Sequence, residues 1–342
     1  MDLHPAEAVR SAFLRLDEAS DLPDKDDLSE ILKTAQAALD SENPAVRPRD
    51  ESGRPGGLVL LDPNITTVVV PDLHARTGYL RSLLELEVEG LSVIEGLFSG
   101  RLQVLCVGDG FHSESRGAMR WKAAWEEYKG GYRTHTAMDG EMRESLSLMA
   151  MVMILKAAVP DRFHFLKGNH ENVANADTGG NRPFGKYAWE GQMVRDWFLV
   201  FLGEDMLDRW ARFESSLPLL AVGGTFLVSH AEPRRAYGRD RVVGYRDDDE
   251  LIFDFTWTGN GEAEDGSVEA MLEEYLGPDA DGALYFGGHR PVGGLYHLRA
   301  DGRYVQVHNP EMYVAAVLAA GRNPDPERDV IVVPQIPTED AR

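Results

Sequence analysis

Short runs of β-branched and aromatic residues alternate with longer amphipathic stretches over most of the chain. Short apolar runs bounded by Gly are typical of buried strands, and a period near 3.6 residues is typical of helices. Helical patterns fall at about residues 80–97, 145–158 and 191–213, and closely spaced strands follow near 284–307. This alternation predicts an α/β fold in which packed sheets are flanked by helices.

The two ends of the chain differ from this central region. Two apolar stripes predict a pair of helices within residues 5–42, the second starting near Asp26 and Asp27. Residues 43–57 contain three prolines and three glycines and predict a linker. We therefore expect a helical extension with its linker (1–57), a main domain (58–320) and a tail (321–342) whose residues 330–333 add an edge strand. The stripes consist of Val9, Phe13 and Leu16, then Leu28, Ile31, Leu32 and Ala35.

Five of the hydrophobic runs end in a polar cluster that contains His or Asp. Because loops that leave the carboxyl ends of strands converge on one face of an α/β sheet, these side chains should lie close together. Oxygen and imidazole groups in such a set suit a pair of divalent transition metals, and two-metal sites mainly hydrolyse phosphate esters. The clusters are Asp72-Leu73-His74, Gly108-Asp109, Gly168-Asn169-His170-Glu171, Ser229-His230 and Gly288-His289.

In this order the clusters resemble the calcineurin-like metallophosphoesterase superfamily, and the closest likeness is to the Ser/Thr phosphoprotein phosphatase family. The stretches 161–171, 181–187 and 213–222 support the narrower resemblance, which extends over about residues 64–315. It implies a four-layer αββα sandwich for the main domain. It also implies hydrolysis of phosphomonoesters by a metal-activated water, with phosphorylated proteins as the leading substrates.

The metal ligands can be assigned residue by residue. Asp72 and His74 lie two apart at a strand end, so both can reach one metal, and Asp109 can bridge because a carboxylate has two oxygens. The resemblance implies that Asn169, which would also contact substrate, completes the second site with two histidines. It implies Mn, or an Fe and Zn pair. The expected ligand set is Asp72, His74, Asp109, Asn169, His230 and His289.

The proton donor and the phosphate-binding residues are harder to assign. The resemblance makes His170 the general acid for the leaving group. The family's Asp-Arg-Gly after the second motif is missing, and Asp109 and Asn169 lie 60 residues apart, which indicates an insertion at about 111–140. Nearby residues could replace this motif: His112 or Glu114 would orient His170, and Arg116 would bind phosphate. Alternatively, Asp139 and Arg143, further along the chain, would take these roles. We favour replacement by the nearby residues.

The remaining candidates are interpreted as structural. His164, His297 and His308 alternate within strand-like segments, and His4 and His135 are expected at the surface. The single cysteine, Cys106, lies in an apolar run and predicts a buried reduced thiol. An aromatic-rich helix should span Trp121, Trp125 and Tyr128 and end at Gly130, with packing as the favoured role; Met138, Met142, Met149, Met151 and Met153 are likewise expected to pack in a helix.

Composition narrows the function classes. A chain of 342 residues with 43% hydrophobic content can bury a large core, and its formal net charge of −22 argues against nucleic acid or an anionic membrane as partner. The amino terminus has no basic segment followed by an apolar one, and no apolar stretch approaches membrane-spanning length. We therefore expect a cytoplasmic location. Two alternatives to a protein phosphatase stay open: a phosphoesterase of nucleotides or diadenosine polyphosphates, and a non-catalytic metal-binding scaffold.

Overall fold

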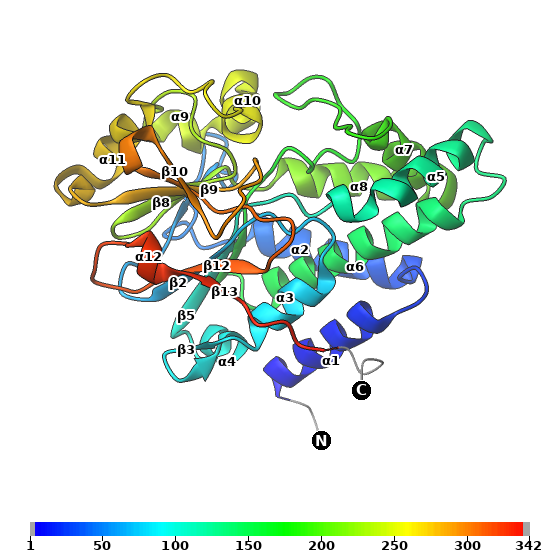
Figure 1. The fold of residues 1–342 in the computed structure, drawn as a ribbon, viewed down its shortest axis with the longest axis horizontal. Coiled ribbons are helices and arrows are strands. Elements are labelled where there is room, and N and C mark those ends of the chain that lie inside the picture. Colours follow the sequence, from blue (N-terminus) through cyan, green and yellow to red (C-terminus); the bar gives the residue numbers. More distant parts are fainter. Residues whose placement is uncertain (1–3, 338–342) are drawn as a thin grey trace.

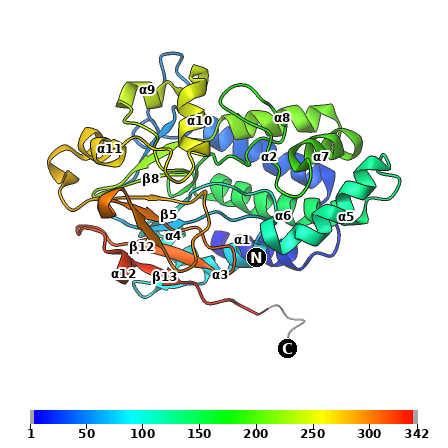
Figure 2. The same ribbon diagram turned by 45° about the horizontal axis from the view of Figure 1, so that its top comes forward.

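A computed structural model describes residues 4–337 of the chain. Two sheets lie face to face at its centre, as Figures 1 and 2 show. The first has the strand order β1 (Leu58–Leu60), β7 (Leu220–Val222), β8 (Phe226–Ser229), β9 (Leu284–Gly287), β11 (Tyr304–Gln306) and β10 (His297–Arg299). The second has the order β13 (Val330–Val332), β12 (Val314–Leu318), β2 (Thr66–Val70), β5 (Leu102–Cys106) and β6 (Phe163–Phe165).

Within each sheet, the motif-bearing strands run parallel to one another. In the five-stranded sheet β2 pairs with β5 and β5 with β6, both in parallel. In the six-stranded sheet β8 pairs with β9 in parallel. The inner faces of both sheets meet in one buried apolar cluster that includes Val69, Leu105, Leu166, Val228 and Phe286. The loops that follow these strands are therefore held by a rigid double sheet.

One layer of helices covers the outer face of the five-stranded sheet and shares a core with Val68, Val104 and Phe163. This layer contains α1 (Pro5–Glu18), α2 (Lys25–Asp40), α3 (Thr77–Leu84), α4 (Val93–Phe98), α5 (Ala118–Lys129), α6 (Thr136–Ala158), α7 (Glu190–Trp197) and α8 (Glu204–Ser215). The other layer packs on Leu227 and Tyr285 of the six-stranded sheet and contains α9 (Arg239–Val243), α10 (Asp249–Trp257) and α11 (Ser267–Leu276). The arrangement confirms the predicted αββα sandwich.

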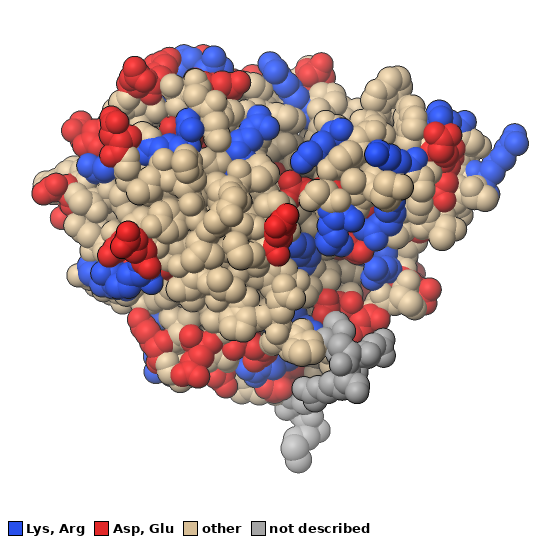
Figure 3. All heavy atoms as spheres, in the orientation of Figure 1, with Lys and Arg blue, Asp and Glu red and all other residues tan. Residues whose placement is uncertain are grey.

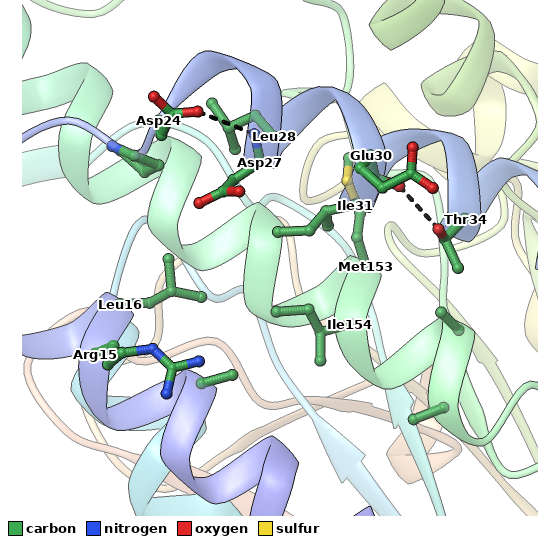
Figure 4. Close-up of a pocket in the computed structure, with 14 residues that line it drawn as sticks. Arg15, Leu16, Asp24, Asp27, Leu28, Glu30, Ile31, Thr34, Met153 and Ile154 are labelled. Carbon is green, nitrogen blue, oxygen red and sulfur yellow. Dashed lines mark hydrogen bonds between the residues drawn. The ribbon is translucent and has the colours of Figure 1, made fainter.

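The two amino-terminal helices occur where the sequence predicts them. Asp24 caps α2 by accepting hydrogen bonds from the backbone N–H groups of Asp26 and Asp27. Both helices pack on α6 within the helical layer. A groove of about 700 Å³ lies between α1, α2 and α6, and Figure 4 shows Leu16, Ile31 and Ile154 pointing into it.

Three predicted helices have different limits in the structure. The stretch 80–97 divides into α3 and α4 around a small hairpin, β3 (Glu87–Val88) and β4 (Leu91–Ser92), which turns at Gly90 with φ 77°. The stretch 191–213 divides into α7 and α8 at Gly203, with φ 88°. Helix α6 begins at Thr136 instead of near residue 145, because Glu127 of α5 accepts hydrogen bonds from its first-turn backbone.

The tail contains the predicted edge strand. This strand is β13, which follows a short helix, α12 (Pro326–Asp329), and pairs antiparallel with β12.

Most of the residues expected to pack in helices are buried. They are the five methionines of α6 and Trp121 of α5, a helix that ends at Gly130 as predicted. Helices α9 to α11 were not predicted. Among residues 4–337, no helix is long and apolar enough to cross a membrane.

Candidate metal centre

All six expected ligands gather where the two sheets present the carboxyl ends of their parallel strands. Asp72 and His74 follow β2, Asp109 follows β5, and Asn169 follows β6 in the five-stranded sheet. The remaining two, His230 and His289, follow β8 and β9 in the other sheet. Asp and His side chains here, all buried except the half-buried His170, form three groups whose ligand atoms lie within 4.8 Å of one another: Asp72, His74 and His308; His74, Asp109 and His170; Asp72, Asp109 and His230.

Asp109 occupies the centre of the cluster. Its Oδ2 lies 3.6 Å from His74 Nε2 and 3.5 Å from His230 Nε2, distances too long for strong hydrogen bonds. Its Oδ1 accepts a hydrogen bond of 2.9 Å from the backbone N–H of His170. One carboxylate oxygen therefore faces two imidazole nitrogens, one from each sheet. This is the position required of a bridging ligand.

The Asn169 side chain joins the two histidines of the other sheet. Its Oδ1 lies 3.0 Å from His230 Nε2 and 2.9 Å from His289 Nδ1. Asp72 is held on the opposite side, where its carboxylate accepts from the backbone N–H of His289 at 3.0 Å. A side chain at Gly288 would place its Cβ 1.8 Å from Asp72 Oδ2, so only Gly fits there. The structure thus brings the expected ligands together, while their metal binding stays a prediction.

Backbone carbonyls fix the orientation of two imidazoles. The Nδ1 of His74 lies 3.1 Å from the carbonyl oxygen of His112, and the Nδ1 of His230 lies 3.1 Å from that of Val107. An Nδ1–H that donates to a carbonyl leaves the Nε2 lone pair free for a metal. Both Nε2 atoms face Asp109, and that of His230 also lies 3.0 Å from Asn169 Oδ1. The two rings are therefore oriented with Nε2 toward the centre of the cluster.

Burial shifts the protonation of the whole cluster. It lowers the pKa of His74 and of His289 to about 3 and holds the pKa of His230 well below its usual value. The same burial raises the pKa of Asp72 and, more strongly, that of Asp109. These imidazoles are therefore neutral near pH 7, whereas the carboxylates need a nearby cation to ionise fully.

The backbone around the cluster is strained. Non-glycine residues rarely adopt positive φ, and each such residue costs of order 1–3 kcal/mol unless the surroundings compensate. Hydrogen bonds from His74 N to Asp109 O (2.7 Å) and from Ala75 N to Gly110 O (2.8 Å) hold two of these loops together. Six of the eleven positive-φ non-glycine residues among those described lie here: His74, Ala75, Asp109, His112, Glu114 and His289, with φ between 43° and 78°.

Glu171 connects two of the loops. Its buried carboxylate accepts hydrogen bonds from the backbone N–H groups of Asp109 (2.9 Å), Gly110 (2.8 Å) and Gly168 (2.7 Å). The conformation of the Asp109 loop is thereby tied to that of the Asn169 loop. Sequence reasoning quoted Glu171 within a motif but gave it no role.

His170 lies beside the central carboxylate, and its Nε2 is 3.9 Å from Asp109 Oδ2. Its buried Nδ1 has no hydrogen-bond partner among the described residues. The ring of His112 is 5.1 Å from the His170 ring, and it stacks on Trp121 at 4.9 Å with its Nε2 3.6 Å from Glu190. His112 therefore contacts the ring of His170 without a hydrogen bond, and its role as the orienting group stays a prediction.

Arg116 lies at the rim of the cluster. Its guanidinium is 3.3 Å from the carbonyl oxygen of Ala75 and pairs with Glu144 at 2.5 Å. A cleft of about 750 Å³ starts here, and its lining includes Ala75, Arg116, Arg143 and Tyr313. Figure 3 shows Lys and Arg side chains over the region of α5 to α8, whereas acidic side chains dominate the lower margin.

The alternative pair lies on α6. Asp139 accepts from Trp197 Nε1 at 2.9 Å and pairs with His135 at 2.6 Å, and Arg143 donates to the carbonyl oxygen of Ala19 at 2.7 Å. Within residues 4–337, no hydrogen bond or ion pair joins either residue to the six expected ligands. This geometry favours His112 or Glu114, together with Arg116, as the replacement for the missing Asp-Arg-Gly.

The position of one histidine was not predicted from the sequence. His308, interpreted as structural, is fully buried beside Asp72 and Glu114 within the cluster. It follows β11 by two residues, but no Gly marks the end of that strand as it does after β5, β6 and β9. In contrast, His164 contacts Glu42 and Lys156 away from the cluster, and His297 is exposed.

Comparison with known proteins supports the fold. No protein-family model and no curated protein matches the sequence. A protein serine/threonine phosphatase from Saccharomyces cerevisiae with similarity to human phosphatase PP5 superposes with a TM-score of 0.52 at 15% identity, over 93% of this chain and 92% of that one. A cold-active protein tyrosine phosphatase superposes with a TM-score of 0.46 at 13% identity, over 77% and 75% of the two chains, too weakly to carry an argument. The chain thus has the fold of the yeast phosphatase.

Proposed function

We propose that this protein is a metal-dependent phosphatase of the calcineurin-like superfamily that hydrolyses phosphomonoesters, with phosphoserine and phosphothreonine in proteins as its expected substrates. One observation carries the proposal: Asp109 Oδ2 lies 3.6 and 3.5 Å from the Nε2 atoms of His74 and His230. Two imidazoles that face one buried carboxylate oxygen at this spacing suit two cations that share that oxygen. The fold shared with the yeast Ser/Thr phosphatase supports the same reaction class.

The donor set fits a pair of divalent transition metals. It contains carboxylate, amide and imidazole groups without thiolate, which suits Mn, Fe or Zn. Asp72 and His74 would hold the first ion, Asp109 would be shared, and Asn169 with two histidines would hold the second. When bound, such a pair supplies an acidified water as nucleophile and neutralises phosphate charge. The two histidines of the second position are His230 and His289.

Two side chains of the protein would act directly on the phosphate ester. Burial and the neighbouring His112 lower the pKa of His170 well below its usual value, so the ring gives up a proton readily. The negative charge of a bound ester must raise this pKa before His170 can protonate the leaving alkoxide. Arg116 lines the adjacent cleft and carries donors suited to phosphate oxygens. The cleft offers room for residues that flank a phosphorylated side chain.

The test is a side-by-side assay of the purified protein with Mn²⁺ on p-nitrophenyl phosphate, phosphoserine and phosphothreonine peptides, and nucleotides. We expect metal-dependent release of phosphate, fastest from the peptides. The Asp109→Asn variant should lose hydrolysis with every substrate while folding normally. Near-full activity of this variant would refute the shared-carboxylate site, and a preference for nucleotides would shift the proposal to the small-molecule alternative.

A further inference from the structure

His308 places an imidazole nitrogen beside the six expected ligands, although it is not one of them. Its Nδ1 lies 3.4 Å from Asp72 Oδ2, yet this buried nitrogen has no hydrogen-bond partner among the described residues. Its other nitrogen, Nε2, lies 3.2 Å from Glu114 Oε2 in hydrogen-bonding geometry. His308 belongs to the cluster, because donor atoms of Asp72, His74 and His308 lie within 4.8 Å of one another.

The two contacts of the ring determine its proton position. The Nε2 of His308 lies in hydrogen-bonding geometry to Glu114 Oε2, while Nδ1 has no hydrogen-bond partner among the described residues. A carboxylate oxygen accepts, so this contact places the ring proton on Nε2 and leaves a lone pair on Nδ1. That lone pair lies 3.4 Å from Asp72 Oδ2. An imidazole lone pair and a carboxylate oxygen in buried contact repel each other unless a cation lies between them.

The spacing matches a shared cation. Donor atoms about 2.0–2.2 Å from one ion lie roughly 3 to 3.5 Å apart when their bonds meet at angles between 90° and the tetrahedral value. The separation of 3.4 Å between Asp72 Oδ2 and His308 Nδ1 falls in this range. A carboxylate that accepts the remote N–H of a coordinating histidine is the usual device that fixes tautomer and ring orientation.

We propose that His308 is an additional ligand of the first metal position, binding through Nδ1, and that Glu114 positions its ring by accepting the Nε2 proton. The proposal rests on the metal centre of the proposed function but not on hydrolysis. It gives the first position protein donors from β2, β5 and β11, of which the β11 donor lies outside the five motifs. It also gives a role to the insertion, which supplies Glu114 in a strained turn with φ 50°.

The proposal gives the two positions the same number of protein donors. The first has Asp72, His74, Asp109 and His308, and the second has Asp109, Asn169, His230 and His289. Without His308 the first position would have only three protein donors. Loss of His308 should therefore weaken metal binding at the first position and leave the second position occupied.

The experiment measures metal binding, not turnover. Metal-free protein is titrated with Mn²⁺ by calorimetry, its metal content is determined after gel filtration, and Co²⁺ is used for its visible spectrum. Wild type should bind two ions. His308→Ala should lose at least about 100-fold in affinity at one position, and Glu114→Gln should lose about 10- to 100-fold there, the range expected for a residue that supports a ligand. Both should alter the Co²⁺ bands.

Two further variants assign the effect to a position. His289→Ala removes a ligand of the second position, so this variant should keep one ion, and adding His308→Ala should release it. His164→Gln is the matched control, because this buried histidine contacts Glu42 and Lys156 instead of the cluster. Its ion stoichiometry and affinities should equal those of wild type.

Unchanged affinities and an unchanged Co²⁺ spectrum in His308→Ala would overturn the proposal. If this variant does not fold, as judged by circular dichroism of metal-free protein, His308→Gln provides the same test with a side chain of similar size. Wild type that binds no ions would refute both this inference and the proposed function. Two bound ions without phosphate release from any ester would refute only the proposed function.

Discussion

His170 is a half-buried side chain at the centre with no assigned metal. Its buried ring nitrogen Nδ1 has no hydrogen-bond partner among the described residues, so its role can be tested separately from metal binding. We expect His170→Asn to lower turnover by about 10²- to 10⁴-fold for alkyl phosphates, whose leaving groups need a proton. p-Nitrophenyl phosphate, which has a good leaving group, should lose much less. Metal content measured on the same samples should stay at the wild-type level; loss of an ion would make His170 a ligand instead.

Arg116 provides the second test at this scale. We expect Arg116→Ala to raise KM and to lower kcat/KM by an amount equivalent to about 2 to 4 kcal/mol, typical of losing one charge-assisted donor to the transition state. Arg143→Ala is the matched control, since Arg143 lines the same cleft but donates to the carbonyl oxygen of Ala19. Steady-state kinetics on a phosphopeptide distinguish the two. Equal losses in both variants would point to the cleft as a whole and not to Arg116.

The sequence was most informative at this scale where a residue directly follows a strand. Asp72 and Asp109 could be placed together because parallel strands present their carboxyl ends on one side. His308 could not be separated from a structural histidine, because its partner Glu114 comes from a turn 194 residues earlier in the chain. The contact between them depends on how the insertion folds, and the periodicity of apolar residues does not indicate this.

At the scale of elements, the existence of the helices that cover the five-stranded sheet was predictable, whereas their limits and the helices α9 to α11 were not. The apolar stripe of α2 identified its buried face, since Leu28, Leu32 and Ala35 pack in the core. The first residue of α6 was not predicted, because Glu127 on another helix caps its first turn. A break such as that at Gly203 depends on φ 88°, which a Gly permits but does not require.

The junction of α2, α6 and β6 contains a buried polar group whose charge state can be tested. Burial and the ammonium of Lys156 lower the pKa of His164 below its usual value. An unfolded chain protonates this residue near pH 6.5, so the folded protein binds fewer protons below that pH and loses stability as the pH falls. Above pH 6.5 both states are neutral and the contribution is constant.

His164→Gln should remove this part of the acid sensitivity. We expect the difference in unfolding free energy between variant and wild type to move in favour of the variant by up to about 1.4 kcal/mol per pH unit below pH 6.5. Urea unfolding at pH 8, 6.5 and 5.5 measures it. His297→Gln, at an exposed position, serves as control and should show no such trend. A constant difference across these pH values would contradict the assignment.

For the whole molecule, metal binding at the proposed centre should raise stability, because the expected ligands come from both sheets. Ions that bind only the folded state add about 2.7 kcal/mol each at a free concentration 100-fold above Kd. We therefore expect chelation to lower the melting temperature and Mn²⁺ to restore it. Differential scanning calorimetry of both forms checks this, with Asp109→Asn as a variant whose melting temperature should respond little. An unchanged melting temperature in wild type would mean that the described cluster binds no ions tightly.

The positive φ angles around the centre have a consequence for how this protein can change. Ala75, with φ 56°, neighbours His74 but offers no ligand, so Ala75→Gly should raise the unfolding free energy by about 1 kcal/mol without loss of ions, as denaturant unfolding and metal analysis can show. At His112 and Glu114 the same exchange would relax the backbone while removing functional side chains. Laboratory selection for heat resistance alone would therefore favour variants that lose the proposed metal ligands and their neighbours, and directed evolution of this protein should screen for metal binding in every round.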